Sequence, residues 1–244
     1  MFQQYLCWSI FLVLLSCHSR SYRLAEKSAP SQSISIDIQN QEFEKITSFI
    51  KPYKQKIDSS LSHVVANNAQ DLKKGVPESS LTNAFADWML WKAKKMDSLK
   101  ADVAIFNLGG LRTEWGKGLI KKSDVFELMP FENELVSVEI SISDFEKLIQ
   151  IINQKPGAPI AGFKLKLKEG EKVKFELNNH TRQTVWVVTS DYLINGGDNF
   201  DFGTIINKNY YGISLRQAIF DRFESAQPNQ FIIMSETDGR VVYE

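Results

Sequence analysis

The sequence predicts a single mixed α/β domain in which helices flank a mixed β-sheet. Three observations lead to this fold class: strand-like and helix-like patterns interleave, they follow no strict β-α-β rhythm, and no internal repeat is present. The 244 residues are 43% hydrophobic and 24% charged, a globular composition with enough apolar residues for one substantial core. We therefore place one folded domain at residues 33–244.

The N-terminal segment is predicted to be processed and lipidated. An apolar run from Trp8 to Leu15 is too short to span a bilayer and is typical of a signal peptide, here residues 1–16. It ends in Leu-Leu-Ser-Cys, which resembles the lipobox of bacterial lipoproteins, so Cys17 is the expected lipidation site. An ordinary signal peptide or a misassigned start stays the alternative, because no Lys or Arg precedes the apolar run.

After cleavage, residues 17–32 would form a tether between lipid and domain, because they are polar and show little apolar periodicity. The expected location is the bacterial cell envelope. The lipid would anchor the protein to a membrane, and the domain would face the periplasm or the cell surface.

The first half of the domain contains two predicted helices and a strand. Apolar residues recur at intervals of three and four over Phe43–Leu61, with Pro52 as a kink or a restart. A second helix begins near Ser79 or Ser80, either of which can cap its first turn. Both helices are expected to pack on the core. The run Asp102–Leu108 is the first predicted strand.

The second half alternates strands with helices. Leu135–Ile142 and Phe163–Leu167 alternate apolar with polar residues, which is the period of a strand with one buried face. Thr184–Thr189 is a further strand-like run. Helices are predicted near Ser143–Ile152 and Ser214–Glu224.

The charge balance argues against one class of ligand. Lys and Arg number 29, and so do Asp and Glu, which gives a formal net charge of zero. Such a chain has no electrostatic reason to bind a nucleic-acid polymer. We therefore expect no nucleic-acid polymer among its partners.

The first candidate binding motif follows the strand residues Val-Ala-Ile-Phe at 103–106 and contains Asn107, Gly109, Gly110 and Arg112. Paired glycines permit positive φ and a close approach of a ligand to the backbone, where successive N–H groups can bind an anion. Arg112 adds a planar, permanently charged group that suits phosphate. A turn with a surface arginine is the alternative interpretation.

The second candidate motif is Met-Pro-Phe-Glu-Asn at residues 129–133. The proline fixes the backbone beside Phe131, so the ring could serve as a stacking platform, and the Asn133 amide could read the edge of a base. Taken alone, a phenylalanine after a proline is more often a core residue.

The third candidate motif is Thr-Ser-Asp-Tyr-Leu-Ile-Asn-Gly-Gly-Asp-Asn-Phe at residues 189–200. Tyr192 can stack on a flat ligand while Asp198 accepts hydrogen bonds from vicinal hydroxyls. The glycines before the acid, including Gly197, let the backbone turn between the two side chains. A base joined to a sugar spans such a distance, although a simple glycine turn is the alternative.

Together, N-x-G-G-x-R, P-F-x-N and D-Y-L-x-x-G-G-D-x-F, in this order, resemble the C-terminal domain of the 5′-nucleotidase family. The resemblance covers residues 33–244. It implies that Phe131 and Tyr192 sandwich a base and that Asn133 contacts the base. Three ordered motifs are far more specific than any one of them.

In that family the C-terminal domain holds the nucleoside and directs the phosphate toward a separate N-terminal metallophosphoesterase domain. The resemblance therefore implies that Asp198 binds the ribose hydroxyls and that Asn107 and Arg112 lie beside the phosphate. Metal ligands of the catalytic domain follow patterns such as D-x-H and G-N-H-D/E, and this sequence has neither. We expect no catalytic residue and no cofactor in this chain, with divalent metals only in a partner.

Two functions remain open. In the first, the chain is the nucleotide-binding half of a 5′-nucleotidase-type hydrolase in nucleotide catabolism, and it positions a nucleotide for phosphate ester hydrolysis by a separate metallophosphoesterase chain. In the second, it is a non-catalytic, lipid-anchored module that binds a nucleoside or a nucleotide. The first is the leading interpretation, and it predicts no activity from this chain alone. A structural envelope lipoprotein is a third reading, and the intact set of Phe131, Tyr192 and Asp198 argues against it.

Overall fold

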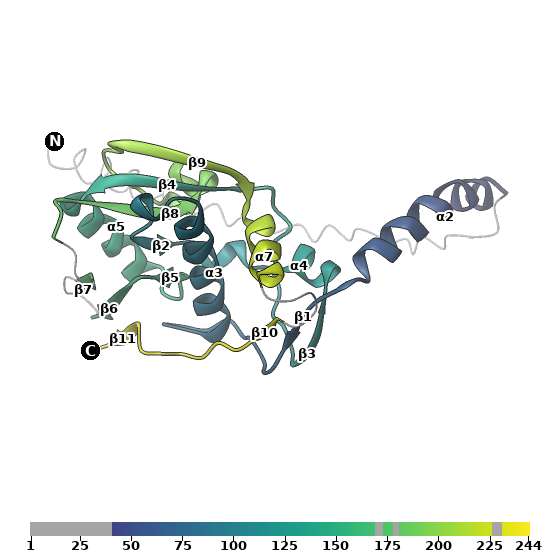
Figure 1. The fold of residues 1–244 in the computed structure, drawn as a ribbon, viewed down its shortest axis with the longest axis horizontal. Helices are drawn as coiled ribbons and strands as arrows, with labels where there is room; N and C mark the ends of the chain where they lie inside the picture. Colours follow the sequence, from purple (N-terminus) through teal and green to yellow (C-terminus); the bar gives the residue numbers. More distant parts are fainter. Residues whose placement is uncertain (1–40, 169–172, 178–180, 226–230) are drawn as a thin grey trace, which may run out of the picture. The chain divides into compact units, whose positions relative to one another are not determined.

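The computed structural model describes residues 41–168, 173–177, 181–225 and 231–244 (Figure 1). The predicted signal peptide, Cys17 and the tether lie outside the described residues. The chain divides into two units, with the boundary between Phe49 and Ile50 of helix α2 (Gln41–Leu61). The second unit, Ile50–Glu244, contains all the strands that the structure describes.

A five-stranded sheet forms the centre of the second unit. Its strands, in order across the sheet, are β5 (Ile160–Ala161), β2 (Val103–Ile105), β8 (Thr184–Ser190), β4 (Glu134–Ser141) and β9 (Asn207–Ser214). β2 and β8 run parallel, whereas the other neighbouring pairs are antiparallel. The sheet is therefore mixed, which confirms the predicted fold class.

Helices pack on both faces of this sheet (Figure 1). One face carries α3 (Ser80–Met96), α4 (Lys122–Leu128) and α7 (Leu215–Glu224), and the other carries α5 (Ile142–Gln154). Successive side chains of a strand point to opposite faces. In β8, Val188 accordingly packs in the core beneath α3, whereas Val187 packs in the core beneath α5.

Two smaller sheets complete the unit, so the described strands form three sheets rather than the one that the sequence predicts. The first consists of β11 (Val241–Tyr243), β6 (Phe163–Leu167) and β7 (Lys174–Leu177), and the second of β10 (Ile232–Ile233), β1 (Val64–Asn68) and β3 (Gly118–Lys121). Alternate residues of β6 are buried, as their apolar and polar alternation predicts.

Helix α3 begins where the sequence predicts. Ser79 is its N-cap: the Ser79 hydroxyl accepts a hydrogen bond from the Thr82 N–H at 3.3 Å, and Thr82 Oγ1 accepts one from the Ser79 N–H at 3.2 Å. This reciprocal capping box satisfies two N–H groups that a helix start otherwise leaves without a partner. Ser80, the other predicted cap, is the first helical residue.

Helix α2 corrects one expectation. It forms over Gln41–Leu61 and continues through Pro52, but the apolar side chains of its second half are exposed rather than packed on the core: Tyr53 exposes 62% of its surface and Ile57 exposes 56%. Periodicity identifies the apolar face of a helix but not what that face contacts. No helix in the described ranges is both long and apolar enough to cross a bilayer.

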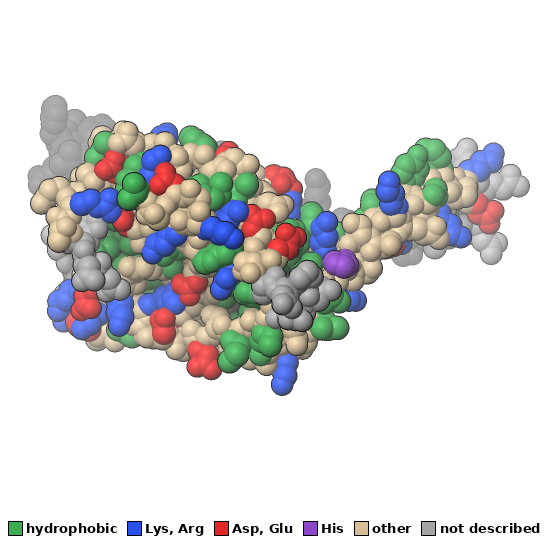
Figure 2. All heavy atoms as spheres, in the orientation of Figure 1, with side chains coloured by type: hydrophobic (Ala, Val, Ile, Leu, Met, Phe, Trp, Pro, Cys, Tyr) green, Lys and Arg blue, Asp and Glu red, His purple; other side chains and the backbone are tan. Residues whose placement is uncertain are grey.

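The surface view shows how charge is distributed. On the visible face, Lys and Arg side chains alternate with Asp and Glu side chains over the second unit (Figure 2). This mixture agrees with the balanced composition of 29 basic and 29 acidic residues. That face of the described chain therefore has no extended patch of one charge.

Candidate functional site

Three loops meet at one edge of the central sheet. β2 and β8 are parallel, so their carboxyl ends share an edge, and β4 begins there because it runs antiparallel to β8, with Leu135 opposite Ser190. The first loop continues β2 into the 3-10 turn η2 (Leu108–Gly110), and the second precedes β4. The third continues β8 into α6 (Asp191–Ile194) and η3 (Gly197–Asn199). Strand pairing thus brings the three sequence motifs together.

A hollow of about 250 Å³ between these loops is lined by eight of the nine predicted binding residues. They are Asn107, Gly109, Gly110, Arg112, Phe131, Asn133, Tyr192 and Asp198. The ninth, Gly197, lies against the Tyr192 ring, since a Cβ atom on Gly197 would be 2.4 Å from Tyr192 Cε1. Phe131 and Tyr192 expose 43% and 42% of their surfaces, so both rings are walls of the hollow and neither belongs to the core.

The carboxylate of Asp198 is held by two side chains. Tyr192 donates its hydroxyl hydrogen to Asp198 Oδ1 at 3.0 Å, and Asn107 Nδ2 donates to Oδ2 at 2.6 Å. The Tyr192 hydroxyl also accepts from the Asp198 N–H at 3.2 Å. An ionised carboxylate has about four lone-pair positions, so it retains acceptor capacity for hydroxyls of a ligand.

The glycines act differently from the sequence prediction. Gly109 and Gly110 do not have positive φ; instead, a Cβ atom on Gly110 would be 3.1 Å from Asn107 Oδ1, so the missing side chain leaves room for Asn107. The left-handed residues of the site lie in the third loop, at Gly196 (φ 86°), Asp198 (φ 52°) and Asn199 (φ 57°). Space is therefore the reason for glycine at Gly110 and Gly197, and backbone conformation is the reason at Gly196.

Arg112 lies at the Phe131 end of the hollow. Its main-chain N–H donates to the Leu128 carbonyl at 2.9 Å, and its Nη1 donates to the Gly109 carbonyl at 3.3 Å. The guanidinium carbon is 5.8 Å from the centroid of the Phe131 ring. A guanidinium carries five N–H donors in a planar fork, which suits an anionic group that enters the hollow beside this ring.

Two residues that the sequence analysis did not single out hold the second loop. Asp191 Oδ1 accepts from the Glu134 N–H at 2.9 Å and so joins the third loop to the start of β4. Arg216, a buried residue of α7, donates Nη1 to the Met129 carbonyl at 2.9 Å and forms an ion pair with Glu132. These contacts fix the backbone on both sides of Phe131.

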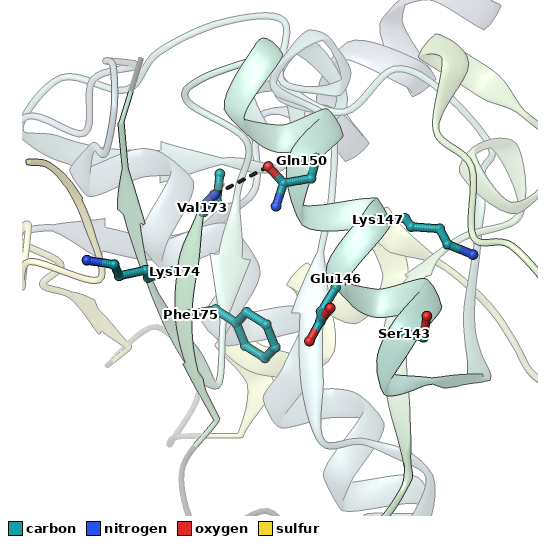
Figure 3. A pocket seen from close by; sticks show the side chains of 7 residues that line it. All are labelled: Ser143, Glu146, Lys147, Gln150, Val173, Lys174 and Phe175. Carbon is teal, nitrogen blue, oxygen red and sulfur yellow. Dashed lines mark hydrogen bonds between the residues drawn. The ribbon is translucent and has the colours of Figure 1, made fainter. Parts of the chain in front are cut away.

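A second and larger hollow, of about 770 Å³, lies between α5 and β7 (Figure 3). Lys147 and Lys174 extend away from the Phe175 ring there, and they pair with Asp144 at 2.8 Å and with Glu244 at 3.4 Å. Gln150 Oε1 accepts from the Val173 N–H at 3.3 Å. Because these polar groups are engaged with the protein and do not converge, this hollow is the weaker candidate.

Metal-ligating side chains do not gather in the part of the chain that the structure describes: no group of three His, Cys, Asp or Glu residues there is arranged to hold an ion. The three histidines of the sequence are His18, His63 and His180, of which His63 alone lies in a described range.

A hollow with aromatic walls and a few convergent polar groups at the edge of a mixed sheet is typical of small-molecule-binding α/β domains. The order and spacing of the three loops indicate one family among these domains. The chain belongs to the family of the 5′-nucleotidase C-terminal domain, whose family model matches residues 60–204.

Curated relatives have a similar sequence over part of their length. The trifunctional nucleotide phosphoesterase protein YfkN of Bacillus subtilis is 28% identical over 150 residues, which cover 52% of this chain and 10% of that protein. A 5′-nucleotidase of Vibrio vulnificus is 22% identical over 232 residues, which cover 89% of this chain and 41% of that protein. The chain therefore spans less than half of the length of either relative.

Solved structures show the same fold. The 5′-nucleotidase precursor from Thermus thermophilus matches with a TM-score of 0.68 and 22% identity, over 82% of this chain and 43% of that chain. The NAD nucleotidase from Haemophilus influenzae matches with a TM-score of 0.60 and 17% identity, over 82% and 41% of the two chains.

Proposed function

We propose that this chain is the nucleotide-binding half of a 5′-nucleotidase-type hydrolase. The observation that carries the proposal is the convergence of two exposed aromatic rings, one carboxylate and one guanidinium around a single hollow of about 250 Å³. A base, a sugar and a phosphate need these three kinds of partner, in this order along the ligand. The names of the relatives point to the same class of substrate.

Each part of the nucleotide is bound by different residues. A base stacks between Phe131 and Tyr192, because every base presents a π-face to an aromatic ring. The main-chain carbonyl of Asn133 accepts a hydrogen bond from the Leu215 N–H at 2.9 Å. The side-chain amide of Asn133 contacts the edge of the base. Asp198 accepts hydrogen bonds from the ribose hydroxyls.

The phosphate lies beside Arg112, on the loop that follows β2. Arg112 binds it through its planar fork, and Asn107 lies on the same loop, next to the Gly109 and Gly110 backbone. Catalysis then depends on presenting the phosphorus to a metal-activated nucleophile, which a separate metallophosphoesterase chain supplies. This chain contributes binding and orientation, and the divalent metals belong to the partner.

The test is reconstitution. The purified chain is assayed for phosphate release from AMP with divalent metals, alone and after mixing with a lone metallophosphoesterase chain that carries a signal peptide. We expect no release from this chain alone and release from the mixture. Adenosine binding together with an inactive mixture would instead favour the non-catalytic binding module, and hydrolysis of AMP by the pure chain would contradict the division of labour.

We also propose that Cys17 carries a lipid that anchors the chain in the bacterial envelope. The support is the Leu-Leu-Ser-Cys sequence at the end of a short apolar run. Cells that express the wild type and Cys17→Ala are fractionated. The wild type is expected in the membrane fraction, and equal processing and equal membrane retention of Cys17→Ala would contradict lipidation.

A further inference from the structure

A lysine outside the predicted site reaches the loop that carries Asp198. Lys155 directly follows α5, and its Nζ donates a hydrogen bond to the main-chain carbonyl of Asp198. The same ammonium lies 5.7 Å from the centroid of the Phe200 ring. Lys155 also lines a small hollow of about 140 Å³ that shares Asn107, Gly109 and Asp198 with the ligand-binding hollow. It is therefore close to the site without lining the ligand-binding hollow.

The loop that Lys155 contacts has an unusual backbone. Asp198 and Asn199 both adopt left-handed conformations, with φ of 52° and 57°, which non-glycine residues seldom adopt in succession. Its main-chain hydrogen bonds are short-range: the Gly196 N–H donates to the Leu193 carbonyl, and the Asn199 N–H donates to the Gly196 carbonyl. Lys155, in contrast, reaches the Asp198 carbonyl from 43 residues away in the sequence.

Lys155 itself is placed by a well-packed turn. Its N–H donates to the Ile152 carbonyl at 3.0 Å, and the Pro159 carbonyl accepts from the Phe106 N–H at 2.9 Å at the end of β2. Between them lies Gly157 (φ 89°), where a Cβ atom would be only 3.0 Å from the Gly75 carbonyl oxygen. The turn is thus fixed against β2 and its neighbours, and Lys155 extends from it to the third loop.

We propose that Lys155 is a positioning residue that holds the Asp198 loop in the shape that directs its carboxylate to the sugar of the ligand. Lys155 acts through the Asp198 carbonyl and not by contact with the ligand. The choice of ligand rests on the proposed function, whereas the effect on the loop does not. Loss of the ammonium should therefore weaken ligands that have a ribose and spare a free base, which contacts the rings.

The binding experiment compares three variants with the wild type. Lys155→Met removes the charge and keeps the chain length, and Lys155→Arg restores a cation. Lys147→Met is the matched control, because Lys147 is a lysine of α5 that lines the larger hollow and pairs with Asp144. Adenosine and adenine are titrated by calorimetry. We expect Lys155→Met to weaken adenosine on the order of tenfold and adenine less than about twofold. Lys155→Arg should recover most of the loss, and Lys147→Met should match the wild type.

A second measurement uses the ligand-free protein. Amide hydrogen exchange over residues 195–200 reports local opening of the loop. We expect faster exchange in Lys155→Met than in the wild type, with Lys155→Arg and Lys147→Met close to the wild type. A merely stabilising role of Lys155 would instead raise exchange throughout the domain.

The outcomes separate the two proposals. If wild type and Lys155→Met bind adenosine equally, or if exchange of the loop is unchanged, the positioning role is overturned and the proposed function stands. If the wild type does not bind adenosine at millimolar concentration, the proposed function fails, and loop exchange alone decides whether Lys155 holds the loop.

Discussion

The hollow between α5 and β7 and the hollow at the sheet edge differ in how their polar side chains are used. In the larger hollow, of about 770 Å³, Lys147, Gln150 and Lys174 are engaged with neighbouring groups of the protein (Figure 3). In the smaller, of about 250 Å³, side chains from three loops converge on one space. The difference teaches that convergent polar groups, rather than volume, mark a binding site.

The largest expected effect comes from replacing one aromatic residue of each hollow by alanine. Tyr192→Ala removes a stacking wall and the hydroxyl that holds Asp198, so adenosine binding should weaken about 100-fold. Phe175→Ala should leave adenosine binding unchanged and lower the free energy of unfolding by about 1–3 kcal/mol, because its half-buried ring packs edge-on against Phe145 at 5.4 Å. Calorimetry and urea unfolding measure the two quantities.

The reverse pattern would break the comparison. If Tyr192→Ala unfolds the domain, that ring belongs to the core, and if Phe175→Ala weakens adenosine, the larger hollow takes part in binding. Phe131→Ala provides a second test of the smaller hollow, with a loss of roughly five- to a hundred-fold in adenosine affinity.

The next largest effect is expected when one cationic side chain of each hollow is replaced by alanine. Arg112→Ala should weaken AMP about 10- to 100-fold and change adenosine little, because only AMP presents a phosphate to the guanidinium. Lys174→Ala, which removes a cation paired with Glu244, should change neither ligand. Titration of AMP and adenosine against both variants measures the difference. An equal loss for the two ligands in Arg112→Ala would place the phosphate elsewhere.

The carboxylates of the two hollows sharpen the comparison. Asp198→Asn keeps the shape of the side chain but removes its charge, so adenosine should weaken about tenfold while adenine is unaffected. Glu146→Gln in the larger hollow should change neither ligand (Figure 3). The measurement is again a pair of titrations with adenine and adenosine. Parallel losses of both ligands in Asp198→Asn would contradict a contact with the sugar.

The smallest effect concerns pH and the larger hollow alone. The hydrogen bond from Lys147, helped by one from Ser141, holds the pKa of the Asp144 carboxyl below its ordinary value. Its folded-state pKa is depressed, so its contribution to stability is present above the unfolded pKa and is lost as pH falls through the folded pKa. Lys147→Met should therefore lower the melting temperature slightly at pH 7, and its difference from the wild type should shrink as Asp144 becomes protonated in acid. A difference that persists in acid would refute this origin.

Much of the fold was predictable because its elements have a clear period. β4, β6, β8, α3, α5 and α7 all form within a few residues of their predicted bounds. β9 was not predicted, because this outermost strand of the central sheet begins with the polar residues Asn207, Lys208 and Asn209. For α2 the helix was predicted correctly but its burial was not: its apolar face is exposed, because a helical period does not reveal whether a core lies beneath it.

The residues that line the hollow could be picked out one by one from the sequence, whereas those that support it could not. Each motif has a local signal of glycine, proline and polar residues, and the pairing of β2, β4 and β8 brings the motifs together. Arg216 and Lys155 have no such signal, since they meet Met129 and Asp198 across 87 and 43 residues of sequence. A positive φ was expected at the paired glycines of the first loop, Gly109 and Gly110, but in the site it occurs at Gly196, Asp198 and Asn199 of the third loop.

The double support of the Asp198 carboxylate has a kinetic consequence. Tyr192 and Asn107 orient both carboxylate oxygens, so a sugar that binds as we propose would meet an acceptor that need not rotate into place. Binding without rearrangement proceeds in one step, and its association rate is set by diffusion and by the orientation of the ligand. Differences in affinity among nucleosides would then arise almost entirely from how fast each one leaves.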